Sequence, residues 1–464
     1  VVISDFNAIA ELISHGVASD LREAAKLSIL AGVDMDLASG AYAQHLAELV
    51  EGGEVPEEVL DESVRRVLRL KFGLGLFEDP YVDEDLSARV ILNPDFRALA
   101  LEEARQSMVL LKNEGQLLPL RADGLRVALI GPLGDDAEDL LGTWAASGQA
   151  GDVETLLAGL KEYLPERSLT STPGCSLDDS VPFDPSAALA AARDADVVVL
   201  AVGESREMSG ESHSRVHLGL PGHQQELVDA LAATGKPLVA VLMCGRPLVI
   251  PKLAEEADAL LVAWHGGIRA GRAVADLLFG AANPSGKLTA SWPRAEGQIP
   301  VYYAHKPTGR PAEGAGTTQF NEPYRSTYLD EPNAPLFSFG TGLSYSTFEY
   351  GHLEVLTPVL TSGGTLRVSV TIRNSSDRTG VEVVQLYVRD VVASVTRPVK
   401  ELKGFARVEL AAGEERRVEL TLPVSELGFH GADLRYTVEP GRFRVWVGPD
   451  STRGLEGEFE VREG

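Results

Sequence analysis

The sequence has little of what would mark a disulfide-rich, metal-binding or membrane protein. Only two cysteines occur among 464 residues, Cys175 and Cys244, and neither belongs to a Cys-x-x-Cys pair, so neither a disulfide framework nor a zinc site is predicted. Runs of 18 or more apolar residues are also missing, so no membrane-spanning helix is expected. With 42 basic against 68 acidic residues, the formal charge of −26 disfavours nucleic acid and anionic membrane surfaces as partners.

A phosphate-binding fingerprint is missing as well. Gly131 and Gly134, in GPLGDD, are interpreted as loop glycines. Cys244 lies in the apolar run LVAVLMCG and is expected to be a core residue. The remaining composition, 44% apolar and 24% charged, is that of a globular chain long enough for two to four domains.

Residues 1–88 are predicted to form two consecutive strand–helix units. The β-branched run at residues 1–3 predicts a short buried strand, and helical patterns then alternate with a second strand-like segment, VDMDL. Two parallel strands cannot close a barrel, and parallel sheets are normally covered on both faces. The segment is therefore expected to be the last quarter of a larger structure. A linker helix is predicted within residues 89–125, along NPDFRALALEEARQSMVLLKNEG.

Two further domains are predicted beyond this helix. From 126 to 300, continuous apolar strands alternate with amphipathic helices, a pattern typical of a mostly parallel sheet covered on both faces. The Gly- and Pro-rich segment 301–348 is too long and irregular for one element and is interpreted as a linker. From 349 to 464, regularly spaced alternating strands indicate an antiparallel sandwich of the fibronectin type III or immunoglobulin kind.

Acidic residues follow two of the predicted strands, where α/β proteins place functional groups. Asp5 ends the first strand, where a barrel would hold a catalytic carboxylate, but helix capping explains its position equally well. A second cluster, Glu204, Glu207 and Glu211, lies in the loop after ADVVVLAVG, where open sheets bind ligands. From composition alone, a solvated charged loop is the simpler interpretation of this cluster.

Eight segments follow one another in order along the chain: SDFNAIAELISHGVASD, AGVDMDLAS, SVRRVLRLKFGLGLFEDPY, MSGESHSR with LGLPGHQQELVDAL, GKPLVAVLMCGRPL, NPSGKLTASWP, YYAHKPTGRP and FSFGTGLSYSTFEY. Together they resemble glycoside hydrolase family 3, in its bacterial β-glucosidase type. The resemblance implies the end of a (β/α)8 TIM barrel, then an α/β sandwich, then a fibronectin type III-like domain. It also implies a retaining, exo-acting β-glycosidase without cofactor or metal, most simply a β-glucosidase that removes nonreducing-end β-D-glucosyl residues.

The resemblance assigns catalytic roles to two carboxylates. The Asp of the family's Ser-Asp-Trp/Tyr segment is the nucleophile and corresponds to Asp5. The Glu of its Ser-Gly-Glu segment is the acid/base and corresponds to Glu211. Residue chemistry agrees, because a retaining glycosidase needs one ionised and one protonated carboxyl group, about 5–5.5 Å apart. Glu204 and Glu207 stay open as alternatives for the acid/base.

Side chains beside these carboxylates have smaller expected roles. Phe6 stands where the family usually has Trp or Tyr, and with Met208 it is expected to contact the substrate as an apolar surface. Asp34 and Asp36, in VDMD, are interpreted as loop and cap residues. His265 replaces a residue that is usually Phe, a departure expected to affect local packing only.

Segments corresponding to the family's first six barrel strands do not occur in the sequence. The resemblance therefore implies that an N-terminal barrel segment, in the same or a second chain, completes the site, and that the 464-residue chain alone is inactive. The expected substrate is an oligosaccharide or an aryl or alkyl β-glycoside. A β-xylosidase or α-arabinofuranosidase and a non-catalytic carbohydrate-binding or assembly fragment stay open, as does a homo-oligomer. The bacterial cytoplasm and an exported location both stay open, because an export signal would precede Val1.

Overall fold

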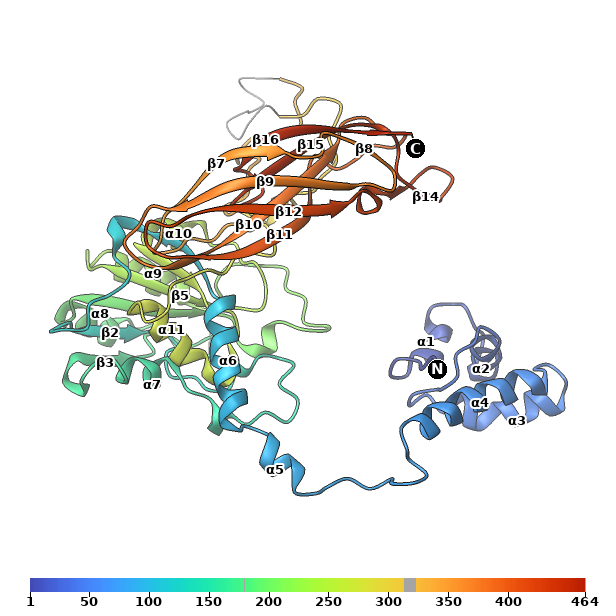
Figure 1. Ribbon diagram of the computed structural model, residues 1–464. Coiled ribbons are helices and arrows are strands. Elements are labelled where there is room, and N and C mark those ends of the chain that lie inside the picture. Colours follow the sequence, from blue (N-terminus) through green and yellow to red (C-terminus); the bar gives the residue numbers. More distant parts are fainter. Residues whose placement is uncertain (179, 313–322, 464) are drawn as a thin grey trace. The chain divides into compact units, whose positions relative to one another are not determined.

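The computed structural model describes residues 1–178, 180–312 and 323–463, and the chain divides into two compact units, Val1–Ile91 and Leu92–Gly464 (Figure 1). Of the predicted linker 301–348, residues 313–322 lie outside the described residues. In the part of the chain that the structure describes, none of the helices combines the length and the hydropathy needed to cross a membrane.

The first unit is made mostly of helices. They are α1 (Ala8–Ser14), α2 (Leu21–Leu30), α3 (Ala41–Glu51), α4 (Glu57–Gly73) and α5 (Leu86–Val90). The two predicted strands amount to one parallel bridge, between Ile3 and Met35. The side chains of residues 1–3 are about half exposed, since no other described strand of this unit pairs with them. The prediction of a buried strand at residues 1–3 is therefore wrong for this unit.

Asp34 is more than the loop or cap residue that the sequence suggests. Its buried carboxylate pairs with Nη2 of Arg66, on α4, at 2.6 Å and accepts a hydrogen bond from the backbone N–H of Val2 at 2.9 Å. The Arg66 guanidinium holds the pKa of Asp34 down, to about 2. Asp36 does act near a helix start, because it accepts a hydrogen bond from the N–H of Tyr42 at 3.2 Å.

The second unit begins with a helix that is shorter than predicted. Asn93 caps α6 (Pro94–Ser107) by accepting a hydrogen bond from the N–H of Phe96 at 2.9 Å. The chain then turns extended at Met108 and forms β1 (Val109–Asn113), which pairs antiparallel with β6. The expected linker helix therefore ends at Ser107, because the VLLKN stretch after it is more stable as a strand at the edge of the sheet.

The α/β part of this unit is built on a six-stranded sheet. The strand order is β1-β6-β5-β4-β2-β3, and all neighbours except β1 and β6 are parallel. Its other strands are β2 (Val127–Ile130), β3 (Leu169–Thr172), β4 (Val197–Gly203), β5 (Leu238–Met243) and β6 (Ala259–Val262). The predicted, mostly parallel sheet is thus confirmed. The short polar edge strand β3, LTST, was not predicted.

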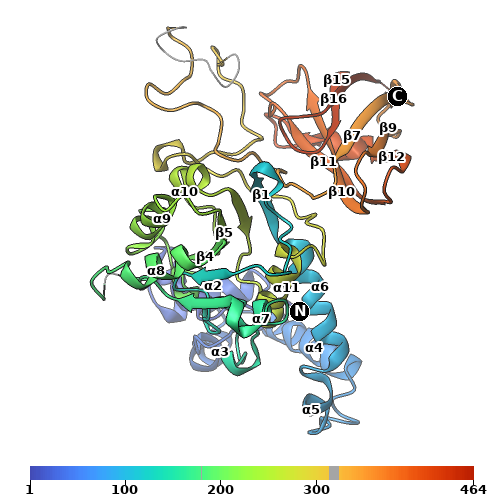
Figure 2. The same cartoon turned by 90° about the vertical axis from the view of Figure 1, so that its left-hand side faces the viewer.

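Helices cover both faces of this sheet (Figure 2). On one face lie α6, α7 and α11, and on the other lie α8, α9 and α10. The bounds of those not yet given are α7 (Leu156–Lys161), α8 (Ser186–Asp194), α9 (Gln224–Ala232), α10 (Pro251–Glu256) and α11 (Ala270–Leu278). Along β4, Val197, Val199 and Ala201 join the first core and Val198, Leu200 and Val202 the second. A continuous apolar strand results because side chains alternate between two buried faces.

The C-terminal part of the second unit is a β-sandwich. One sheet has the order β11-β10-β15-β16-β8 and the other the order β12-β9-β7. The strands are β7 (Phe348–Val355), β8 (Val359–Thr361), β9 (Thr365–Asn374), β10 (Gly380–Asp390), β11 (Glu401–Leu410), β12 (Glu415–Pro423), β15 (Gly441–Gly448) and β16 (Leu455–Arg462), with a small hairpin of β13 (Phe429–His430) and β14 (Tyr436–Thr437). Alternate residues of these strands fill one core, as the sequence predicts.

Candidate active site

The loop of residues 204–215, which holds the candidate acid/base Glu211 and is called the acid/base loop below, leaves the C-terminal end of β4. Its start is fixed by Gly203, where an added Cβ would lie 1.7 Å from the carbonyl oxygen of Met243 on β5. Only glycine allows this close approach of the two strands. The buried side chain of Gln224 also holds Gly203, accepting from its N–H at 2.7 Å and donating to its carbonyl at 2.9 Å.

Glu204, the first residue of this loop, is fully buried, with 0% of its surface exposed. Its Oε1 atom pairs with Nη1 of Arg215 at 2.7 Å and with Nε of Arg246 at 3.3 Å. Among the described residues, none forms a hydrogen bond with Oε2. A carboxylate without accessible surface cannot pass a proton to a substrate, so the structure argues against Glu204 as the alternative acid/base.

Arg246, which follows β5, fastens the loop on both sides of Glu211. Its Nη2 donates to the carbonyl oxygen of Met208 and, at 2.8 Å, to that of His213. Gly210, next to Glu211, has a φ of +114°, a backbone conformation that residues other than glycine rarely adopt. Glu211 itself is exposed at the tip of the loop.

A neighbouring loop supports the acid/base loop from a second side. The hydroxyl of Thr143 donates to the carbonyl oxygens of Arg206 and Ser209, and a carboxylate oxygen of Asp139 accepts from the N–H of Arg206 at 2.8 Å. Burial raises the pKa of Asp139. Trp144 follows Thr143 directly and is 73% exposed, so an apolar ring lies free on the segment that supports this loop.

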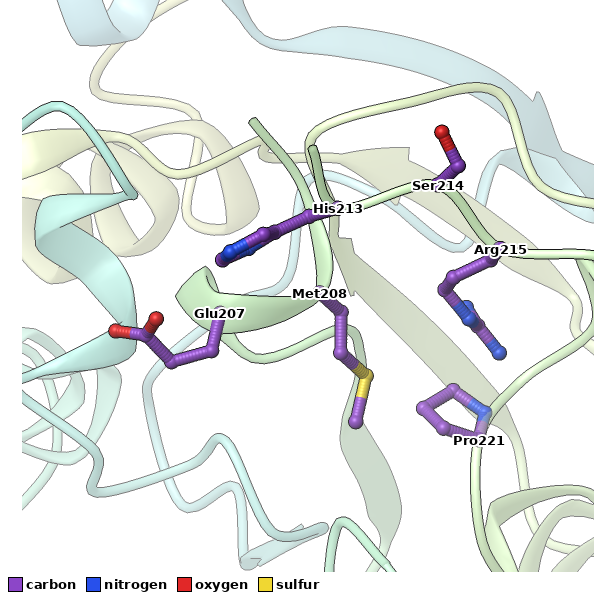
Figure 3. Close-up of a pocket in the computed structure, with 6 residues that line it drawn as sticks. All are labelled: Glu207, Met208, His213, Ser214, Arg215 and Pro221. Atoms are coloured by element: carbon purple, nitrogen blue, oxygen red, sulfur yellow. The ribbon is translucent and has the colours of Figure 1, made fainter. Parts of the chain in front are cut away.

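Two cavities adjoin the acid/base loop. One, of about 310 Å³, is lined by Glu207, Met208, His213, Ser214, Arg215 and Pro221. Figure 3 shows the Met208 side chain on the side of Arg215 and Pro221, whereas the Glu207 carboxylate points away from them. The other cavity, of about 580 Å³, shares Ser214 and Arg215 and is lined further by aromatic rings that include Tyr302 and Phe339.

Asp5 lies in the first unit, between the bridge at Ile3 and helix α1. Its exposed carboxylate accepts a hydrogen bond from the N–H of Phe6 at 2.6 Å. The residue at the N-cap of α1 is Asn7, and no side-chain cap bond is formed there. Helix capping, the alternative interpretation of Asp5, is therefore wrong. Phe6 is 72% exposed in this unit, so its ring is free to contact a ligand.

Two other residues singled out in the sequence lie in the α/β part, where Cys244 is buried and His265 is half-buried. Cys244 is a core residue, as expected, and burial raises the pKa of its thiol. His265 lies against Gly142 and Gly245, and burial lowers its pKa. Within the described ranges, no group of three or more His, Cys, Asp or Glu residues is arranged to hold a metal ion.

Sequence reasoning missed Thr143, Trp144 and Arg246 as parts of this site, and it gave Arg215, within the loop, no role. The segment GRP after β5 and the WAASG run carried no chemical signal of their own. Their role depends on which backbone carbonyls come within reach after folding.

Three family models match the chain in order. They are the glycosyl hydrolase family 3 N terminal domain over residues 1–70, the glycosyl hydrolase family 3 C-terminal domain over 108–345, and the fibronectin type III-like domain over 382–451. The chain belongs to glycosyl hydrolase family 3. The resemblance predicted from the ordered segments is therefore confirmed.

Relatives within glycosyl hydrolase family 3 are similar along the whole chain. A periplasmic β-glucosidase of Salmonella typhimurium is 41% identical over 99% of this chain and 63% of that protein. A β-xylosidase of Formosa agariphila is 38% identical over 97% of this chain and 63% of that protein. A mutant β-glucosidase from Listeria innocua, crystallised with laminaribiose, is 43% identical with a TM-score of 0.94, covering all of this chain and 63% of that one. The chain thus spans about 63% of the length of these relatives.

Proposed function

We propose that this chain carries the nucleophile and the acid/base of a retaining, exo-acting β-glucosidase. The observation that carries the proposal is the acid/base loop, in which Glu211 is exposed at a tip whose flanking carbonyls are fastened by Arg246 and Thr143. Such a fastened but accessible carboxyl group suits proton transfer to a bound substrate. Membership in glycosyl hydrolase family 3 and the β-glucosidases among its relatives support the same activity.

The proposed reaction takes two displacement steps. In the first, the Asp5 carboxylate attacks the anomeric carbon while Glu211 gives its proton to the glycosidic oxygen, so that the leaving group departs as an alcohol. In the second, Glu211 accepts a proton from water, the water oxygen attacks the same carbon, and the bond to Asp5 breaks. The sugar leaves with its original anomeric configuration, and both carboxyl groups return to their starting states.

Apolar surfaces would orient the sugar rings in this reaction. Phe6, next to the nucleophile, and Met208, in the acid/base loop, are the proposed contacts for the glycosyl unit. The exposed ring of Trp144 is proposed to contact the leaving group, because it follows Thr143, which supports the loop that carries Glu211.

The first unit is proposed to be the last two βα units of a (β/α)8 barrel, within the predicted limits 1–88. Support comes from the family match over residues 1–70 and from the parallel bridge between Ile3 and Met35. The side chains of Ile3 and Met35 each expose more than a third of their surface. Further barrel strands, in the same or a second chain, would cover such surfaces. The predicted limits of the other domains, 126–300 and 349–464, remain proposals too.

The nucleophile is tested by covalent trapping. A 2-fluoro-glucoside with an activated leaving group should label Asp5, identified by mass spectrometry of the labelled peptide. The reagent is added to the protein alone and to the protein mixed with the N-terminal barrel segment of a family member. That segment is about 200 residues long, judged from the size of a typical complete barrel. Asp5→Asn should abolish labelling, whereas the control Asp61→Asn, another exposed acid of the first unit, should not. Labelling of another carboxylate would contradict the assignment.

The acid/base is tested by leaving-group dependence. With the N-terminal barrel segment added, Glu211→Ala should slow hydrolysis of cellobiose by about 10²–10⁴-fold and of dinitrophenyl glucoside far less, since only the poor leaving group needs a proton. Azide should partly restore the latter reaction. Glu207→Ala is the matched control in the same loop, and if it showed this signature instead, the role would pass to Glu207.

Sugar specificity has a second candidate, β-xyloside hydrolysis, favoured by the 38% identity to the Formosa agariphila β-xylosidase. Paired assays with 4-nitrophenyl β-glucoside and β-xyloside decide between them, and a higher kcat/KM for the glucoside is expected. If neither glycoside is hydrolysed and the 2-fluoro-glucoside does not label the protein, with or without the added barrel segment, a non-catalytic carbohydrate-binding role replaces the proposed activity.

A further inference from the structure

Arg246 holds both ends of the loop tip that carries Glu211. Its Nη2 group bonds the carbonyl oxygens of Met208, before Glu211, and His213, after it. One guanidinium thus closes the segment 208–213 on itself. Arginine suits this bridge because its donors are fixed in one plane, whereas a lysine ammonium is a point charge on a flexible stem.

The position of Arg246 depends in turn on Glu204. The fully buried carboxylate pairs with Arg246 at 3.3 Å and with Arg215 at 2.7 Å. Arg215 also donates to the carbonyl oxygen of Gly219 at 3.2 Å, which fastens the chain beyond the tip. Because a buried charge is costly unless it is paired, these three side chains keep one another in place.

No other role has been assigned to the Glu204 carboxylate. Glu204 is inaccessible to substrate, and its contacts are with two guanidinium groups that bond backbone carbonyls around the acid/base loop. An acid needed only for helix or sheet stability would not require partners that reach both sides of residue 211. The arrangement therefore points to control of loop position.

We propose that Arg246, held by Glu204, is a positioning residue for the acid/base carboxyl group of Glu211. This inference rests on the proposed function of Glu211. Neither Arg246 nor Glu204 touches the substrate in this scheme, and the effect passes through the backbone of residues 208–213. Misplacement of a catalytic group by about 1 Å can slow a reaction by about 10²-fold, so a loosened tip weakens proton donation to the leaving group.

The kinetic experiment uses the protein with the N-terminal barrel segment of a family member added, and it compares substrates with poor and good leaving groups. Arg246→Lys and Glu204→Gln should lower kcat on cellobiose by about 10–10²-fold and on dinitrophenyl glucoside by less than about 3-fold. Arg272→Lys is the matched control, because Arg272 pairs with the fully buried Asp276 at 2.7 Å, on α11. That control should lower the melting temperature without separating the two substrates. Equal slowing of both substrates by Arg246→Lys would overturn the proposal.

A second measurement is independent of activity. Amide hydrogen exchange of residues 205–213 should become faster in Arg246→Lys and Glu204→Gln and stay unchanged in Arg272→Lys. Unchanged exchange in the first two variants overturns the positioning role. If Arg246→Lys does not fold, Glu204→Gln carries both measurements. If the exchange results are as expected but Glu211→Ala shows no leaving-group dependence, the proposed role of Glu211 fails while the fastening of the loop stands.

Discussion

Glu204 and Asp276 are both fully buried in the α/β part of the molecule, and each carboxylate is shared by two arginines, but they hold different kinds of structure. Asp276, on α11, binds Arg105 of α6, Arg272 of its own helix and the hydroxyl of Tyr163. Although burial alone would raise the pKa of Asp276, the hydrogen bonds from Tyr163 and the two arginines lower it. Both oxygens of this carboxylate have partners, and all of these belong to helices or to the turn after α7.

The two arginines that pair with Glu204 differ from those at Asp276 in the other hydrogen bonds that they form. Arg215 and Arg246 each donate from Nη2 to backbone carbonyls of loops, and one oxygen of Glu204 has no hydrogen-bond partner in the described residues. The same pair of residue types therefore fastens helices in one place and a loop in the other. What differs is where the guanidinium groups reach, which is decided by the elements that carry them.

A third buried carboxylate, Asp390 at the end of β10, is the contrasting extreme. Neither of its oxygens has a side-chain or backbone hydrogen-bond partner within the described structure, and burial raises its pKa to about 6. The backbone N–H of Val392 and the guanidinium of Arg397 favour the charged form of Asp390 but do not outweigh burial, whereas Glu204 and Asp276 are each paired directly with two arginines.

The largest expected effect is on stability at Asp276. Asp276→Ala should lower the free energy of unfolding by about 3–5 kcal/mol, because two arginines then lose a buried partner. Glu204→Ala should cost less, since its arginines lie beside loops that can open to water. Scanning calorimetry of the α/β transition measures both changes. A larger loss for Glu204→Ala would show that its network holds the core and not only the loop.

The next prediction concerns Asp390 and pH. Its pKa is about 6 when folded, against 3.8 for an unperturbed aspartate, so between those values the folded state holds a proton that the unfolded state has lost. Stability should therefore fall as pH rises through this window, with the penalty fully present above pH 6. Asp390→Asn should stabilise the sandwich by roughly 2–3 kcal/mol at pH 8 and have little effect below pH 4.

Urea unfolding of Asp390→Asn across pH 4–8 checks this prediction. Asp433→Asn, an exposed acid between β13 and β14, is the control and should show no such pH dependence. A pH-independent gain in Asp390→Asn would mean that the substitution acts through packing and not through charge.

A smaller effect is expected at Gly210, where the acid/base loop meets Thr143. An added Cβ would lie 2.6 Å from Cγ2 of Thr143, at a φ of +114°. Gly210→Ala should cost about 1–3 kcal/mol and speed amide exchange in residues 206–213. Gly151→Ala, where nothing lies within 4 Å, should change neither measurement appreciably. Unaltered exchange in Gly210→Ala would mean that the loop is not held against Thr143.

The smallest effect is expected at Glu207, the exposed acid of the same loop. It pairs with Arg206 at 3.2 Å near the surface, and such pairs contribute between about zero and 1 kcal/mol. Glu207→Gln should therefore leave the melting temperature within about 1 °C, as thermal scans can show. A drop as large as that of Glu204→Gln would remove the distinction between the two acids.

Local hydrophobic patterns in the sequence are enough to specify the classes of structure in this protein. The all-apolar run Val197–Gly203 predicted a strand buried on two faces, and the alternation along Thr365–Asn374 predicted one face buried in a sandwich. These predictions succeed because the period of hydrophobic residues is a local property of the chain. The ordered segments likewise led to glycosyl hydrolase family 3, with Asp5 and Glu211 as candidates that still await test.

Which acids and apolar segments are buried depends on contacts that form when the chain folds. Three glutamates share the acid/base loop, yet Glu204 is buried because two arginines, one of them from beyond β5, converge on it. The VLLKN segment became β1 because β6, far along the chain, offers an edge to pair with, and residues 1–3 stayed exposed because no described strand of their unit covers them. Ion pairs and strand partners form between residues distant in sequence, so no local pattern can specify them.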